Sequence, residues 1–508
     1  MDYLFFIVML PLLAGLVVGM IPGDRTKAIR GVTLAASGIS ASLALIAFCS
    51  FDLDAEKLQF ETKWVWVESL GLNFHLAADG INIGIIFMGA VVAFAAVCCA
   101  GDVTHRIKEF YFLLNLMICG VLGAFASMEL FFFYFFHELA LVPTFIMIGV
   151  WGRGQNRNYA TFKITLYLSF GALLALIGLI GVYVQTGAET FSIPELIKKV
   201  QEGQPIEESA QQWIFPLMMF GFGILVSLWP FHTWAPLGYG AAPTATAMLH
   251  AGVLKKFGLY GLIRVAIPMA PAGAQTWLEV LAWLALANLL FCGLVAVRQK
   301  DLNQLIGNSS VAHMGFIFLG IASLNVIGLT GAVLVMIAHG LLAAVAFGLS
   351  GHLYQQHGSL DMTRMGGLFR KMPLVGTALL MAMMAGCGLP GFANFAGEIT
   401  IFFAAWSAGF KTITMIAAWS ALVIGGLYML RAIRNILHGP QGEDWDRASD
   451  ASPLVASALG LLLAVLLVFG FAPNLLTKRI EGEVKNICLL YTSPSPRDLS
   501  TSRMPSSA

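Results

Sequence analysis

The chain contains 508 residues, of which 58% are hydrophobic and 11% are charged, and its formal net charge is +1 at pH 7. Soluble domains carry about a quarter charged residues, so this composition excludes an ordinary water-soluble globular protein. A net charge so close to zero also argues against a nucleic-acid-binding surface. The cysteines form no CxxC or Cys/His spacing, so we expect no disulfide framework, zinc site or iron–sulfur cluster.

Long apolar runs occur along the whole chain, and a helix needs about 20 apolar residues to cross a bilayer. The sequence therefore predicts an all-α polytopic membrane protein with about fourteen transmembrane helices. The first run lacks the positive segment of a cleaved signal peptide, so we expect it to remain as a helix. The predicted spans lie near residues 4–21, 31–50, 80–100, 110–128, 130–150, 161–184, 213–229, 244–267, 276–297, 302–323, 326–352, 373–405, 411–435 and 453–472.

Loop charges predict the orientation of these spans. Loops of one parity are basic and loops of the other parity are acidic or uncharged, and basic loops face the cytoplasm. Both termini are therefore expected on the outer side of the membrane, opposite the cytoplasm. The basic loops carry Arg25, Lys27, Arg30, Arg106, Lys108, Arg153, Arg157, Arg298, Lys300, Arg364, Arg370, Lys371, Arg431 and Arg434.

Two stretches outside the spans have predictions of their own. Residues 192–200, in the longest loop, are expected to form a short helix along the outer surface. Residues 486–508 form a Ser/Pro/Arg-rich tail that lacks apolar periodicity, and we expect it to be disordered. The tail also resembles translated adapter sequence rather than native protein.

Helix breakers interrupt two predicted spans, at Pro230 in the seventh and at Gly388–Gly391 in the twelfth. Grouping the helices as 4–8 and 9–13 places each break in the fourth helix of five, which predicts two inverted repeats with ion sites near the breaks. Proline kinks used only for packing are the alternative. The predicted units are 1–108 (helices 1–3), 109–267 (first repeat), 276–435 (second repeat), 453–472 (helix 14) and the tail 486–508.

A few ionisable side chains fall inside the predicted spans, where each costs several kcal/mol, with estimates from about 2.5 to about 17 kcal/mol. They are Glu138, Lys163, Lys255, Lys256 and Glu398. A buried carboxylate and a buried lysine have coupled proton affinities, so these residues mark a candidate proton pathway. A purely structural ion pair is the alternative for Glu138, and Lys163, nearer a helix end, could extend to the interface instead.

Histidines and a few further charges accompany these residues. Histidine can relay protons because its ordinary pKa lies near 6.5, although a lone histidine in a helix more often only bonds the neighbouring backbone. His313 and His339 are the leading relay candidates, and His137, His250 and Arg264 are secondary candidates for the pathway. The sequence contains no glycine-rich nucleotide loop, Ser/His/Asp arrangement or haem motif, so the energy for transport is expected from an ion gradient or a partner.

Several motifs resemble one known family. FFHELALVP (135–143), APTATAMLHAGVLKKFGLYGLIR (242–264), SSVAHMGF (309–316), MIAHGL (336–341) and GLPGFANFAGE (388–398) look like the antiporter-like membrane subunits of respiratory complex I and of multisubunit cation/proton antiporters. The resemblance covers roughly residues 1–475. Glu398, where sister subunits typically carry lysine, and the end of the chain after about fourteen helices point to the M-type subunits of bacterial NADH:quinone oxidoreductase.

The resemblance implies a role for each matching residue. Glu138, Lys163, Lys256 and Glu398 match the ionisable residues of helices 5, 6, 8 and 12, His313 and His339 match histidines of the hydrated central axis, and Asp79 matches an acidic residue at the start of helix 3. It further implies that this chain binds no cofactor, that NADH, FMN, iron–sulfur clusters and quinone belong to partner subunits, and that two sister antiporter-like subunits flank it in the bacterial inner membrane.

The sequence departs from the family pattern in the seventh helix. Members usually carry a lysine about four residues before the proline that is Pro230 here, and this chain has Val226 and Ser227 instead. Lys163 and Lys255 are candidate substitutes as partner of Glu138. Three functions remain open at this point: a proton-translocating subunit of complex I, a subunit of a sodium/proton antiporter or membrane-bound hydrogenase, and a non-pumping scaffold.

Overall fold

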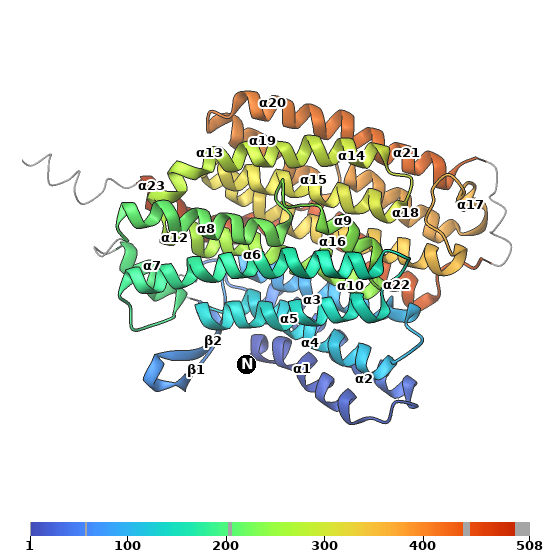
Figure 1. Cartoon of the computed structure of the whole chain (residues 1–508), viewed down its shortest axis with the longest axis horizontal. Helices are drawn as coiled ribbons and strands as arrows, with labels where there is room; N and C mark the ends of the chain where they lie inside the picture. Colours follow the sequence, from blue (N-terminus) through green and yellow to red (C-terminus); the bar gives the residue numbers. More distant parts are fainter. Residues whose placement is uncertain (1, 56–57, 202–205, 440–447, 493–508) are drawn as a thin grey trace, which may run out of the picture.

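The computed structural model describes residues 2–55, 58–201, 206–439 and 448–492, and its long helices run side by side along the molecule (Figure 1). In this part of the chain, twelve helical segments are long and apolar enough to cross a membrane. Each overlaps a predicted span, which confirms the polytopic all-helical class. The two other predicted spans, 244–267 and 373–405, are helical but interrupted, so the count of fourteen stays a prediction.

The first six helices are uninterrupted, as expected for long apolar runs whose backbone must be satisfied within the helix in a membrane. Proline is accommodated inside two of them, at Pro11 and Pro143. The third helix is almost wholly buried and belongs to the core, whereas the first two face outward on one side. The six are α1 (Tyr3–Met20), α2 (Thr26–Cys49), α3 (Asn82–Cys98), α4 (Ile107–Ala126), α5 (Leu130–Trp151) and α6 (Arg157–Thr186).

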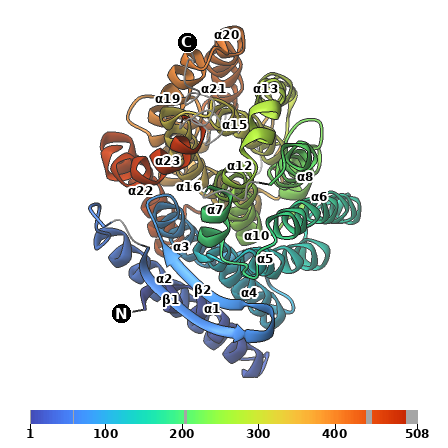
Figure 2. The same ribbon diagram turned by 90° about the vertical axis from the view of Figure 1, so that its left-hand side faces the viewer.

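Short elements cover one end of the bundle (Figures 1 and 2). The helix α7 (Ile193–Gln201) confirms the short helix predicted in the longest loop, and its apolar residues turn inward. An antiparallel hairpin, β1 (Gln59–Val67) and β2 (Leu72–Ala78), was not predicted. The β-branched and aromatic residues of 59–67 were its signal, and Gly71 turns the chain with a φ of 65°.

The middle of the chain contains the first break. The helix α8 (Glu208–Val226) ends where Ser227 takes a positive φ, and the chain resumes as α9 (Trp234–Ala241). Pro230 has no N–H to continue the helix. The next helix runs through two π-helical turns, in the order α10 (Thr244–Leu249), η3 (His250–Leu254), α11 (Lys256–Gly261), η4 (Leu262–Ala266) and α12 (Ile267–Met269); it is called the lysine helix below.

The centre of the bundle is formed by α15 (Leu302–Ala322) and α16 (Val326–His357), which are buried along their candidate spans. In the end view of Figure 2, α16 lies among the surrounding helices. The side chains of Asp301 and Asn325 accept from backbone N–H groups and cap the two N-termini. Preceding them are α13 (Pro271–Ala287), the π-helical turn η5 (Asn288–Cys292) and α14 (Gly293–Arg298).

The last part of the chain contains the second break, at residues 387–392, where Gly388 and Gly391 have positive φ. The final helix continues through Thr492, so the disorder predicted from residue 486 is wrong for the first residues of the tail, and 493–508 lie outside the described residues. Buried Leu476, Ile480 and Val484 give this helix an amphipathic period that a search for purely apolar runs passes over. The elements are α17 (Leu368–Lys371), α18 (Pro373–Gly386), α19 (Ala393–Ser407), α20 (Lys411–Trp419), the π-helical turn η6 (Ser420–Gly425), α21 (Gly426–Leu437), α22 (Pro453–Phe471) and α23 (Asn474–Thr492).

Candidate functional site

Lys256 lies at the start of α11, and no part of its side chain is exposed. Its Nζ is 2.6 Å from the carbonyl oxygen of Ala251, within the π-helical turn η3, and 2.9 Å from Nδ1 of His339 on α16. The amine therefore has one fixed acceptor and one partner that can itself gain or lose a proton. π-helical turns often accompany functional sites.

His339 leads on to two further titratable groups. Its ring lies 5.5 Å from that of His313 on α15, measured between centroids. Nδ1 of His313 is 2.7 Å from the carbonyl oxygen of Ser309, and its Nε2 is 3.9 Å from Oε1 of Glu398 on α19. The structure thus brings together Lys256, His339, His313 and Glu398, which we call the central line.

A cavity of about 20 Å³ lies at the far end of the central line. His313, Glu398, Ser420 and Tyr428 contribute to its polar lining. A cavity of at least about 10–15 Å³ with polar partners can hold one water molecule. Oε1 of Glu398 is buried and has no hydrogen-bond partner among the described residues. A water molecule in the cavity could bond this oxygen.

Lys255 is as deeply buried as Lys256 but points elsewhere. Its Nζ is 3.3 Å from Oγ of Ser310 and 5.6 Å from the centroid of the Tyr239 ring. Oγ of the neighbouring Ser309 is 3.2 Å from the hydroxyl of Tyr428, which lines the cavity. Two adjacent serines of α15 therefore contact Lys255 and the cavity wall, respectively. Sequence reasoning did not single out these two serines or Tyr428.

His250 lies beside the lysines in an aromatic cluster. Its ring is 5.5 Å from that of Trp234 and 5.4 Å from that of Tyr239. Its Nδ1 is buried without a hydrogen-bond partner among the described residues. Its contacts are therefore those of a packed core histidine, and no hydrogen bond joins it to the central line in this part of the chain.

Glu138 lies on α5 with 34% of its side chain exposed. Its Oε1 is 3.3 Å from Nδ1 of His137, whose ring stacks on Phe257 at 4.1 Å between centroids. Phe257 directly follows Lys256. His137 therefore lies between Glu138 and the lysine helix, a position that its sequence context did not reveal.

Lys163 lies on α6 and is half-buried. Its Nζ is 5.7 Å and 5.9 Å from the ring centroids of Tyr159 and Tyr167, both on its own helix. Among the described residues, no ion pair joins it to Glu138, and none joins Lys255 to Glu138 either. The pairing of Glu138 with a lysine thus stays a prediction.

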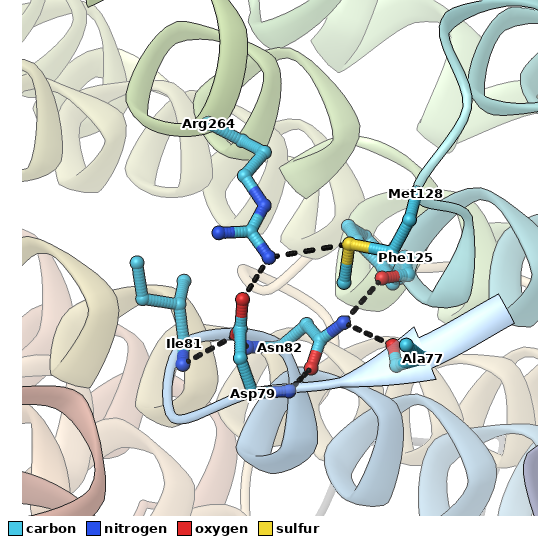
Figure 3. Close-up of polar contacts among 7 residues, drawn as sticks. All are labelled: Ala77, Asp79, Ile81, Asn82, Phe125, Met128 and Arg264. Carbon is cyan, nitrogen blue, oxygen red and sulfur yellow. Dashed lines mark hydrogen bonds and ion pairs between the residues drawn. The ribbon is translucent and has the colours of Figure 1, made fainter. Parts of the chain in front are cut away.

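Asp79 and Arg264 form an ion pair near the end of the bundle that carries the hairpin (Figure 3). The other carboxylate oxygen of Asp79 accepts from the backbone N–H groups of Ile81 and Asn82, at 2.9 and 3.0 Å. Arg264 also reaches the sulfur of Met128. These contacts tie the lysine helix to the start of α3, and no contact between described residues joins them to the central line.

The described residues contain no group of three or more His, Cys, Asp or Glu side chains that could hold a metal ion. All seven cysteines are free thiols. The ionisable side chains assembled at the centre are instead an amine, two imidazoles and a carboxylate, whose shared chemistry is proton exchange.

Residues 127–425, more than half of the chain, match the family model described as NADH:quinone oxidoreductase/Mrp antiporter, TM. The chain belongs to this family. A relative from Picosynechococcus sp., named NAD(P)H-quinone oxidoreductase chain 4 1, is 32% identical over 504 residues, which cover 96% of this chain and 93% of the relative.

Solved structures agree with this assignment. A chain of respiratory complex I from Thermus thermophilus with bound NADH has a TM-score of 0.87 at 26% identity, covering 96% of this chain and 99% of that chain. A chain of the Mrp complex from Dietzia sp. has a TM-score of 0.84 at 21% identity, covering 96% and 98%, which shows the shared fold.

The first break is where the resemblance led us to expect a lysine. Val226 and Ser227 occupy these positions instead, and both are buried. The carbonyl of Ser227 accepts from Nδ2 of Asn288 at 3.0 Å, and the N–H of Trp229 donates to Oδ1 of the same residue at 2.6 Å. The neutral side-chain amide of Asn288, on η5, thus hydrogen-bonds the backbone at this break. Asn288 was missed because uncharged amides give no signal in a search for intramembrane charges.

A second ion pair, also missed, lies at the opposite end of α3. Asp102 pairs with Arg153 and accepts from the backbone N–H of Thr244 at 2.9 Å and from its hydroxyl at 2.8 Å. Thr244 is the first residue of the lysine helix. The acidic residues near both ends of α3 therefore bind the lysine helix, one at each of its ends.

Proposed function

We propose that the chain is a proton-translocating membrane subunit of an NADH:quinone oxidoreductase, coupling electron transfer from NADH to quinone with proton movement. The succession of titratable side chains from Lys256 through His339 and His313 to Glu398, each within 5.5 Å of the next, supports this proposal most directly. Relatives named NAD(P)H-quinone oxidoreductase chain 4 support the assignment to such a complex. NADH, FMN, iron–sulfur clusters and quinone would then be held by partner subunits.

The hydrogen bonds at the two ends of the central line indicate how its members could exchange protons. With Nδ1 of His313 donating to the Ser309 carbonyl, Nε2 of the neutral ring is left as an acceptor that faces Glu398. Glu398 in its protonated form can deliver a proton in that direction, and it receives one when the flow reverses. At the other end, the Lys256 amine exchanges a proton with His339.

The distance between His313 and Glu398 decides how the last transfer occurs. At 3.9 Å the two atoms are too far apart for a direct hydrogen bond. The adjoining cavity has room for one water molecule, which would bridge Nε2 of His313 and Oε1 of Glu398. The Ser420 and Tyr428 hydroxyls in the cavity wall would orient that water.

The surroundings of Glu138 form the second part of the proposed pathway. His137 is the side chain that lies between Glu138 and the lysine helix, so we assign it the connecting role rather than Lys163 or Lys255. In the two-repeat arrangement, 109–267 would carry this part, and 276–435 would carry most of the central line.

We also propose the setting of the chain in the cell. It would lie in the inner membrane of a bacterium, flanked by two sister antiporter-like subunits, with both termini on the periplasmic side. The bacterial relatives and the basic loops of one parity support this placement. The end that carries the hairpin and α7 would then face the periplasm.

Replacing Glu398 with glutamine in the assembled complex tests the function. The amide keeps the shape of the side chain but cannot carry the proton, so NADH-driven proton uptake by inverted vesicles should fall while NADH oxidation by quinone continues. Acid–base groups contribute about 10²–10⁴-fold to proton-transfer steps, so transfer through this chain should slow by about that factor. Glu279→Gln, an exposed carboxylate on α13, is the matched control. Normal proton uptake in a fully assembled Glu398→Gln complex would disprove the proposal.

A sodium/proton antiporter subunit is the second candidate, because the family model covers both kinds of protein and the Mrp chain has the same fold. Sodium dependence separates the two. Vesicles containing an antiporter would exchange external sodium for protons without NADH, whereas the proposed subunit would require NADH oxidation.

A further inference from the structure

Two π-helical turns join the first helix break to the cavity at Glu398. The turn η5 begins at Asn288, and η6 begins at Ser420, and both side chains are buried. Ser420 donates to the carbonyl oxygen of Leu289 at 3.2 Å, so the two turns are hydrogen-bonded to each other. Asn288 from η5 and Ser420 from η6 therefore both belong to a chain of contacts that links the first break to the cavity.

Asn288 uses both ends of its carboxamide. Its Nδ2 lies 3.0 Å from the carbonyl oxygen of Ser227 and 3.0 Å from that of Val311, and its Oδ1 accepts from the Trp229 N–H. Val311 lies two residues before His313 on α15. A single buried side chain thus bonds two residues of the break directly after α8 and also α15, the helix that carries His313.

The contacts continue from η5 to the cavity. Leu289, next to Asn288, and Ser420 both line the cavity that contains the Glu398 carboxylate. Glu398 in turn packs over the second break: a Cβ on Gly388 would lie 2.7 Å from its Oε2. The path therefore runs from the first break, through Asn288, Leu289 and Ser420, to the carboxylate at the second break.

We propose that Asn288 is a positioning residue for proton transfer between His313 and Glu398. By fixing the first break against α15 and η5, it sets the width of the cavity in which these two groups exchange a proton. A shift of the segment around Ser227 then moves two walls of that cavity together. One wall is α15, which carries His313, and the other is η5, whose Leu289 carbonyl accepts from Ser420. This inference rests on the proton-translocating function proposed above.

The test compares Asn288→Ala, Ser420→Ala and the double variant in vesicles that contain the complete complex. Asn288→Ala should lower the protons taken up per NADH oxidised and shift the midpoint of the pH profile of uptake, while electron transfer is retained. Because both residues act on the same cavity, Ser420→Ala should add little in the Asn288→Ala background. Fully additive losses, or a normal proton yield, would overturn the inference.

Asn115→Ala is the matched control. This buried carboxamide also joins two helices, donating to the Thr33 hydroxyl and the Tyr111 carbonyl at 2.8 Å each, and it does not line the cavity. Its removal should leave the proton yield and the pH profile unchanged; an equal loss would mean that any broken interhelical bond has this effect. If Asn288→Ala fails to assemble, Asn288→Gln, which keeps the carboxamide on a longer side chain, must lower the yield for the inference to stand.

The Glu398→Gln complex serves as the reference that separates the two proposals. A low yield in Glu398→Gln with a normal yield in Asn288→Ala rejects the positioning role and leaves the proposed function intact. Normal yields in both variants reject the function itself.

Discussion

The central line and the surroundings of Glu138 both contain a carboxylate, a histidine and a lysine. They differ in how deeply these side chains are buried and in whether they contact one another. In the central line, Lys256 and Glu398 are buried and successive partners come from different helices. Around Glu138, the carboxylate is one-third exposed, and Lys163 lies near aromatic rings of its own helix. An ionisable residue within a membrane span is therefore a candidate for proton transfer, and contact with the next titratable group distinguishes a relay from an isolated charge.

The ion pairs at the two ends of α3 play a different part from either region. Asp79 with Arg264 and Asp102 with Arg153 hold opposite ends of the lysine helix. Breaking a buried pair by removing one partner costs about 3–5 kcal/mol, because the other charge is left uncompensated. These pairs fix the depth of Lys256 in the bundle, and so they support the central line without belonging to it.

The largest expected effect comes from breaking the central line at its start. Lys256→Met should remove most of the proton uptake contributed by this chain, because His339 loses its proton-exchange partner. Lys255→Met should have a smaller effect, since that amine contacts Ser310 and Tyr239 instead. NADH-driven proton uptake in vesicles measures both variants. Equal losses would show that the two lysines share one role and that their separate contacts do not matter.

A smaller effect is expected where the contacts are incomplete. Glu138→Gln should reduce proton uptake less than Lys256→Met, and His137→Phe, which keeps the ring stacked on Phe257, should reduce it by a similar amount. Lys163→Met should leave uptake near normal. If Lys163→Met instead matched Glu138→Gln, the lysine would be the working partner of Glu138, and the contrast between the two regions would weaken.

The smallest expected effect concerns Glu129, a buried carboxylate just before α5. Burial raises the pKa of Glu129 to about 6 from its ordinary value of 4.5, although a hydrogen bond from Asn73 and the charge of Lys63 lower it. The folded state then binds more protons than the unfolded state between these values, so its stability decreases as the pH rises from about 4.5 to about 6.

Hydrogen exchange of the β2 amides, corrected for intrinsic rates, measures this effect. Protection should be greater at pH 5 than at pH 7, and Glu129→Gln should remove the difference. An unchanged difference in that variant would assign the pH dependence to another group. His75 cannot be that group, because burial lowers its pKa and its contribution would make protection greater at pH 7.

Prediction from sequence succeeded for the helix breaks and for the short helix of the long loop, because proline, glycine and amphipathic spacing act over a few residues. It missed Asn288, Asp102 and the hairpin. A neutral amide and a charge at a helix end have no distinctive local pattern, and the hairpin depends on strand pairing as well as on composition. The disorder predicted from residue 486 was wrong at its start because α23 is stabilised by packing against α16.

The sequence by itself determined that the chain lies in a membrane and which charges lie inside it, since hydrocarbon tolerates few charges and each apolar span is contiguous. The tertiary structure alone decided which of those charges meet. Lys255 and Lys256 are adjacent, yet successive residues point about 100° apart on a helix, so only the packing of α15 and α16 sends one to Ser310 and the other to His339. The contact between Lys256 and His339 joins residues 83 positions apart, a separation that no local pattern encodes.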